Sequence, residues 1–147
     1  MKNVLFIIIF LTFFSCNKQQ TTEKINSDVI LNMWKNVIIP EKRLELHFET
    51  EEIFNCANYQ IKYKIEQTNS KIKINLTNIL TPNVCLDALG PATAKIDLGV
   101  LVNGTYNIFV TVNKKENKGT LTVTDEKYTL SIESLNQLQI ESYSLAR

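Results

Sequence analysis

Hydrophobic and polar residues alternate with a period of two along much of the chain after residue 42. In the segment RLELHFET (43–50), leucine and phenylalanine side chains occupy every second position between charged or polar residues. The segments YQIKYKIE (59–66), KIKINL (71–76), TYNIFVTV (105–112), GTLTVT (119–124) and YTLSIES (128–134) repeat this pattern. Alternation places one set of side chains on each face of an extended strand, so each segment is predicted to be a half-buried β-strand.

The segments between these strands have weaker patterns. TPNVCLDALGPATAK (81–95) breaks the alternation and contains two prolines and a glycine, so we expect a long crossover there. NKKENKG (113–119) predicts a polar hairpin loop, and LQIESYSL (138–145) is a candidate for a last strand. DVILNMWKNVIIP (28–40) is mixed and indicates one strand or two short ones, with Trp34 expected in the core.

Seven or eight strands, with no helix after residue 16, predict an all-β fold and an antiparallel β-sandwich. A turn centred on Thr68 and Asn69 would pair Ile65 with Ile72 and keep apolar residues opposite each other along that hairpin. A slip of one residue would place isoleucines opposite lysines. At a later hairpin, the turn TDEK pairs Leu121 with Leu130 and Val123 with Tyr128.

The N-terminus has a different pattern, MKNVLFIIIFLTFFSC (1–16). Lys2 gives it a positive charge, and the apolar run that follows is shorter than the ~20 residues needed to cross a bilayer as a helix. A charge, an apolar run, a small residue and a cysteine in this order predict a cleaved signal peptide at residues 1–15.

The four residues Phe13, Phe14, Ser15 and Cys16 resemble the lipobox of bacterial lipoproteins, in the looser form of Bacteroidota-type proteins. The resemblance implies that Cys16 is acylated and becomes the N-terminus after cleavage. Its acyl chains, palmitate among them, would then anchor the protein in a membrane. An ordinary secretory signal with an incidental Cys16 is the alternative.

Cleavage would leave a polar lipidated tether at residues 16–28 and a β-sandwich domain at residues 29–147. No acidic residue follows Cys16 until Glu23. In related lipoproteins this favours the outer membrane facing the periplasm over the cell surface. Removing residues 1–15 leaves fifteen basic and fifteen acidic side chains, and this balance argues against bulk binding of nucleic acid.

Cys56 and Cys85 are the two cysteines that remain beside Cys16. An even pair in an exported domain predicts a disulfide, and closing a loop of that separation contributes about 3.5 kcal/mol in the chain-entropy model. A metal pair or redox thiols are the alternative. Their spacing is far from C-x-x-C, and no further ligand lies nearby in the sequence, so the disulfide is the better explanation.

Four lysines fall on the polar face of one predicted hairpin: Lys62, Lys64, Lys71 and Lys73. A solvated face whose lysines guard a sheet edge explains them without a ligand. The functional interpretation is a patch for anionic envelope material such as lipid headgroups, acidic glycans or an acidic protein partner. Glu45 and Glu49 of a neighbouring strand would neutralise part of this patch.

Candidate catalytic and metal-binding residues are few. His47 is the single histidine and shares the polar face of its strand with Glu45 and Glu49. These three could in principle bind a metal, while a solvated charged face is the simpler interpretation. Neither carboxylate pair, at 51–52 or 125–126, suggests an acid and a base flanking one bond. We therefore expect no catalytic residues, no metal and no cofactor.

The stretch LGVLVNGTY (98–106) is similar to a pattern of Ig-like and fibronectin-like sandwich domains. The resemblance implies a bend at Gly104 and a packed corner at Tyr106. In layout the whole chain resembles uncharacterised envelope lipoproteins, which implies a fold class and no activity. We expect a non-catalytic module that binds an envelope protein or glycan through the lysines or through loops 81–95 and 113–119. The alternatives are a structural subunit that lends an edge strand, and an envelope hydrolase with a cryptic site.

Overall fold

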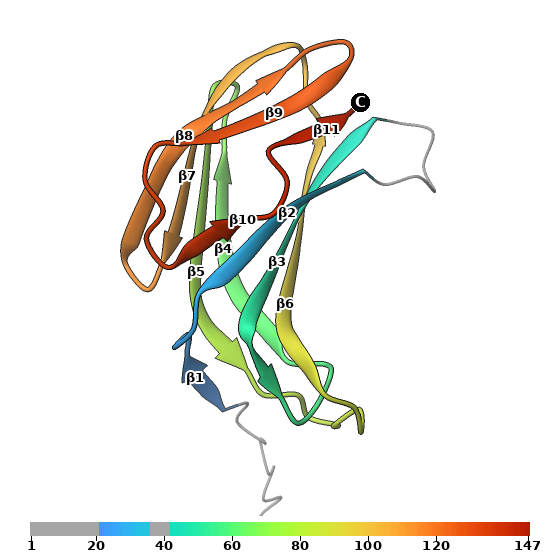
Figure 1. The fold of residues 1–147 in the computed structure, drawn as a ribbon, viewed down its shortest axis with the longest axis vertical. Coiled ribbons are helices and arrows are strands. Elements are labelled where there is room, and N and C mark those ends of the chain that lie inside the picture. The colour runs from blue at the N-terminus through green and yellow to red at the C-terminus, as the bar shows by residue number, and fades with distance from the viewer. Residues whose placement is uncertain (1–20, 36–41) are drawn as a thin grey trace, which may run out of the picture.

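A curled sheet of mixed strand direction makes up the fold in the computed structural model, which describes residues 21–35 and 42–147 (Figure 1). The described residues form eleven strands and no helix. The strands are β1 (Thr22–Lys24), β2 (Val29–Lys35), β3 (Arg43–Phe54), β4 (Gln60–Gln67), β5 (Lys71–Leu80), β6 (Gly90–Val100), β7 (Gly104–Val112), β8 (Lys115–Val123), β9 (Lys127–Ile132), β10 (Leu138–Ile140) and β11 (Ser144–Ala146). Their order is β10-β2-β3-β6-β4-β5-β7-β8-β9-β11, and β1 pairs with β5 outside this path.

The all-β prediction is confirmed, but the purely antiparallel arrangement and the count of seven or eight strands are wrong. Three pairs are parallel: β2 with β10, β4 with β6, and β5 with β7. Each of these pairs joins strands that are not consecutive in the sequence. No local turn signal announces such a pairing, because parallel neighbours need a crossover rather than a hairpin.

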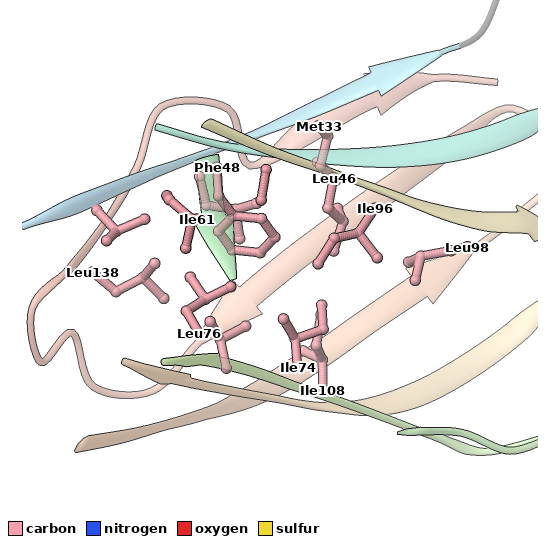
Figure 2. Close-up of a cluster of buried hydrophobic side chains, with 14 of the residues drawn as sticks. Met33, Leu46, Phe48, Ile61, Ile74, Leu76, Ile96, Leu98, Ile108 and Leu138 are labelled. Carbon is pink, nitrogen blue, oxygen red and sulfur yellow. The ribbon is translucent and has the colours of Figure 1, made fainter. Parts of the chain in front are cut away.

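The sheet curls so that side chains from two sides meet in one core. Strands β2, β3 and β6 lie on one side of the core, and β5 and β7 lie on the other (Figure 2). Seven of the facing side chains are 2% exposed or less: Met33, Leu46, Phe48, Ile96, Ile74, Leu76 and Ile108. Full burial of such side chains contributes roughly 1.5–3 kcal/mol each, so this shared core holds the two sides together.

The C-terminal residues 138–146 close one side of the curled sheet. β10 pairs in parallel with β2, and β11 pairs with β9 in the antiparallel sense. Between these strands, the N–H of Glu141 donates to the carbonyl oxygen of Leu31 at 3.0 Å. The N–H of Leu130 donates to the carbonyl oxygen of Tyr143 at 2.9 Å. The last two strands therefore bridge β2 and β9.

β4 and β6 are joined much less closely. Among the described residues, Gln60 and Thr93 form the single registered pair between them, and the strands diverge beyond it (Figure 1). The hydroxyl of Tyr63 reaches across and donates to the carbonyl oxygen of Lys95 at 3.4 Å. Because the gap is open, Tyr63 is 40% exposed and Ile65 is 37% exposed, although both were expected on a buried face.

Part of the expected tether belongs to the folded domain. β1 pairs in register with residues 78–80 of β5, and Ile25 is fully buried. The three β1 side chains are all exposed, so this strand is held through its backbone and shows no apolar alternation. Residues 22–24, which were expected in the tether, therefore belong to the described sheet.

The crossover expected over residues 81–95 is partly a strand. β6 begins at Gly90, and Ala92 and Ala94 are 0% and 5% exposed on its inner face. Alanine is small and is depleted in strands, so its alternation with Thr93 gives a weak strand signal.

The hairpin loop expected over residues 113–119 is shorter than predicted. β8 already begins at Lys115, which leaves Asn113 and Lys114 as a two-residue turn. Both have positive φ, 48° and 70°, as a type I′ turn requires. The polar residues after Lys114 that indicated a loop are strand residues.

The predicted register is correct for the β8–β9 hairpin and wrong for the β4–β5 hairpin. Leu121 pairs with Leu130, and Val123 pairs with Tyr128, as expected. In the β4–β5 hairpin, Ile65 pairs with Ile74 rather than Ile72. From Tyr63 to Gln67 the shift is two residues, which leaves these side chains on their original face, so alternation cannot distinguish the two registers. A bulge after Lys62 then pairs Ile61 with Ile79.

Tyr106 packs at the bend between β6 and β7, where the sequence placed it. It is 4% exposed, and its hydroxyl donates to the carbonyl oxygen of Val102 at 3.0 Å. Gly104 starts β7 with a φ of 153°, in the region that favours glycine. The tyrosine thereby fastens the turn that leads into its own strand.

Candidate functional site

The four lysines singled out in the sequence lie on one outer surface of the sheet, which we call the lysine face. Lys62 and Lys64 belong to β4, and Lys71 and Lys73 belong to β5. Lys71 and Lys73 flank the buried Ile72, and β4 pairs alongside β5. Since side chains alternate along a strand, the lysines project away from the core. The structure therefore brings together the residues that the pattern grouped.

A groove of about 230 Å³ crosses the lysine face from β4 to β8. Its lining includes Lys64, Glu66, Lys73, Asn75, Phe109 and Glu116. The ammonium group of Lys71 lies 4.8 Å from the ring centroid of Phe109, in a cation–π arrangement. The groove thus presents two ammonium groups, two carboxylates, an amide and an aromatic ring.

A second groove of about 520 Å³ adjoins the first, because Asn75 lines both. Its other polar lining residues are Lys24, Thr77, Asn78, Asn113 and Lys114. Lys24 comes from β1, while Asn113 and Lys114 form the turn between β7 and β8. The pairing of β1 with β5 and the tight β7–β8 turn therefore build this second half of the site. Neither feature was visible in the sequence pattern.

The acidic residues beside the lysine face differ from those expected. Glu45 and Glu49 lie on β3, which is separated from β4 by β6 in the sheet order. Glu66 and Glu116 line the first groove instead, and Glu116 lies 3.4 Å from the ammonium group of Lys118. Four lysines line the two grooves against these two glutamates: Lys24, Lys64, Lys73 and Lys114. The site as a whole is cationic.

Cys56 and Cys85 lie at disulfide distance, as their pairing in the sequence predicted. Their Sγ atoms are 2.06 Å apart and their Cα atoms 5.2 Å apart. The bond joins the β3–β4 connection to the loop that precedes β6. Cys16 lies outside the described residues, so its lipidation stays a prediction.

His47 lies on the outer face of β3, as expected, and is half-buried. Its Nε2 atom is 2.9 Å from Oε2 of Glu45, and its ring stacks on Trp34 with centroids 5.6 Å apart. Trp34 is 53% exposed rather than buried, because Leu31 and Met33 take the inward positions of β2. In the part of the chain that the structure describes, no group of three or more His, Cys, Asp or Glu residues is placed to hold a metal ion.

Comparison with known proteins gives this chain no family. Within residues 21–35 and 42–147, no helix has the length and apolar character needed to cross a bilayer. No family model, curated protein or solved structure matches the chain.

Proposed function

We propose that this chain is a lipid-anchored, non-catalytic binding module of the bacterial cell envelope. Its acylated Cys16 would hold an Ig-like β-sandwich domain at the outer membrane, on the periplasmic side. Its ligand would be an acidic glycan of the envelope, bound along the lysine face. The observation that supports this most is the pair of adjoining grooves that meet at Asn75.

The chemistry of the two grooves suits an extended anionic sugar chain. Lys64 and Lys73 supply ammonium groups for carboxylate, phosphate or sulfate groups. The side-chain amides of Asn75 and Asn78 can both donate to and accept from sugar hydroxyls. The half-buried ring of Phe109 adds an apolar surface beside Lys73, on the neighbouring strand β7. An elongated ligand could contact all of these groups at once.

Retention on immobilised acidic polysaccharide tests the ligand. The variant with Lys62, Lys64, Lys71 and Lys73 all replaced by glutamine should lose retention at low salt. Its matched control replaces four described lysines that lie outside β4, β5 and β7, namely Lys35, Lys42, Lys95 and Lys127. Both variants lose the same charge, so equal loss of retention would point to net charge and refute a specific lysine face.

Processing at Cys16 tests the anchor. Mass spectrometry of the protein from envelopes of a bacterial host should find residues 1–15 removed and three acyl chains on Cys16. The Cys16→Ala variant should leave the membrane fraction or retain its leader. An intact, unacylated leader on the unaltered chain would contradict the anchor.

The open side between β4 and β6 supports a second candidate function, that of a structural subunit. The two strands share one registered pair among the described residues, so a partner strand could add to the sheet there. Crosslinking in intact envelopes separates the candidates. A structural subunit should give one discrete adduct through β4 or β6, and a glycan-binding module should not.

A further inference from the structure

Four large apolar side chains lie exposed at one end of the domain, and we call this group the apolar tip. They are Ile53 (58% exposed), Val84 (75%), Leu86 (57%) and Leu89 (76%). Ile53 lies near the end of β3, in register with Pro91, and the other three belong to the loop that leads to Pro91. Exposed apolar groups gathered in this way mark a contact with another protein or with a membrane.

Several backbone polar groups in the loop of the apolar tip are hydrogen-bonded within the protein. The side-chain amide of Asn58 donates to the carbonyl oxygen of Val84 at 2.7 Å and accepts from the N–H of Leu86 at 3.1 Å. The carbonyl oxygen of Leu86 accepts from the N–H of Ala57 at 3.3 Å, and the disulfide pins Cys85 between them. Backbone groups bonded internally lower the cost of entering a lipid phase, and the carbonyl of Val84 and both backbone groups of Leu86 are bonded in this way.

The apolar tip lies at the end of the domain where the chain arrives from Cys16. The carbonyl oxygen of Thr21 accepts from the N–H of Thr81, the first residue after β5, at 3.2 Å. β1 and the loop before β6 both lie at the lower end of the domain in Figure 1. Only residues 17–20 separate Cys16 from Thr21, and five steps of at most ~3.6 Å span about 18 Å. An acylated Cys16 would therefore hold this end close to the bilayer.

The charges of the apolar tip distinguish it from the lysine face. Asp87 is the only charged residue between Thr81 and Pro91, and no lysine or arginine lies among them. Attraction to anionic headgroups is therefore not available to the loop. Contact with a bilayer would depend on apolar side chains entering the interface, which is insensitive to salt.

We propose that the apolar tip inserts into the interface of the same membrane that holds the lipid anchor. This inference rests on the anchor proposed above. Insertion would add a second membrane contact to the acyl chains and would fix the direction in which the domain points. The lysine face, along the flank of the sheet, would then stand at a set distance from the bilayer.

Depth-dependent quenching of a tryptophan placed in the tip tests this. The acylated protein is reconstituted into zwitterionic vesicles that contain brominated lipid, with Trp34→Phe removing the native tryptophan. Leu89→Trp in this background should show blue-shifted emission and lose most of its intensity to bromine, also at about 1 M salt, where charge interactions are screened. Val102→Trp is the control, because Val102 is 72% exposed in the bend between β6 and β7 at the opposite end.

The outcomes separate this inference from the anchor. Equal quenching of the two reporters in protein that floats with the vesicles would overturn the inserted tip and leave the anchor standing. Protein that does not float at all would overturn the anchor, and the tip proposal with it. Blue-shifted emission of Leu89→Trp in native envelopes but not in pure lipid vesicles would also overturn lipid insertion. It would assign the tip to a protein partner. Val84→Ser with Leu86→Ser should reduce the quenching of Leu89→Trp while flotation continues.

Discussion

Asn117 and Asn136 hold each other through a reciprocal pair of hydrogen bonds. The amide of Asn117 donates to the carbonyl oxygen of Asn136 at 3.3 Å, and the N–H of Asn136 donates to Oδ1 of Asn117 at 2.5 Å. The same amide donates to the carbonyl oxygen of Val110 at 3.0 Å, and Asn117 is fully buried. One polar side chain therefore fastens the segment before β10 to the β7–β8 hairpin.

Asn117→Ala should destabilise the domain by about 1–3 kcal/mol, because it leaves buried backbone groups without partners. The free energy of unfolding from urea titration measures this. Asn107→Ala, on the exposed face of β7, should change it by about 0.5 kcal/mol or less. Equal losses for the two variants would contradict the role of Asn117.

Gly119→Ala should also destabilise the domain, by about 1–3 kcal/mol, because it overpacks the sheet. A Cβ atom at Gly119 would lie 2.0 Å from the carbonyl oxygen of Ser131 and 2.9 Å from Cα of Ile132. β8 and β9 would have to move apart. Thr120→Ala at the next position is the control, and thermal unfolding of the two variants tests the difference. A Gly119→Ala protein as stable as the control would show that the strands yield freely.

Reduction of the disulfide should lower stability by about 3.5 kcal/mol on the chain-entropy estimate for its sequence separation of 29 residues. Urea midpoints with and without reductant measure the loss. The variant with Cys56→Ser and Cys85→Ser should start at the lower midpoint and should not respond to reductant. A response of that variant would assign the effect to another group.

Asp97 should give a pH-dependent contribution to stability. The hydrogen bond from the guanidinium of Arg43, at 2.5 Å from Oδ2, holds the pKa of Asp97 below its usual value of 3.8, with help from the N–H of Gly99. A carboxylate with a lowered folded pKa stabilises the fold above its unfolded pKa, and this stability is lost as pH falls through the folded value.

Asp97→Asn should therefore cost about 0.2–1 kcal/mol at pH 7, the range for an exposed pair, because the side chain of Asp97 is 43% exposed. The difference between this variant and the unaltered protein should shrink as pH falls below about 4. Unfolding free energies measured at several pH values provide the test. A difference that grows on acidification would have the wrong sign.

Tyr106→Phe should cost about 0.5–1.5 kcal/mol, because it removes the hydrogen bond to the carbonyl oxygen of Val102 while keeping the packed ring. Tyr143→Phe is the matched control, since Tyr143 is 49% exposed. Chemical denaturation compares the two. If both changes are neutral, the bend before β7 does not depend on the hydroxyl.

The alternation of apolar and polar residues predicted the features that depend on residues close together in the sequence. Leu121 and Leu130 were paired correctly because a short turn and an apolar alternation together fix one register. The lysine face was also predictable, since alternation alone decides which face Lys62 and Lys73 share. The parallel pairing of β5 with β7 was not predictable, because strands separated by a crossover carry no signal that names their partner.

The remaining differences also have physical causes. Lys24 and Lys114 joined the candidate site through β1 and through a two-residue turn, and neither feature appears as an alternation. Trp34 was expected in the core. Its position, one residue after the buried Met33, places it on the outer face, where it stacks on His47.

The parallel pairing of β10 with β2 has a consequence for biosynthesis. β2, the first long strand of the domain, has no partner along one edge until almost the entire polypeptide has been made. If the chain is exported as proposed, its sheet can be completed only after residues 138–140 have also crossed the membrane. Proteolytic loss of the last ten residues would leave both β2 and β9 as bare edges, and such edges invite aggregation.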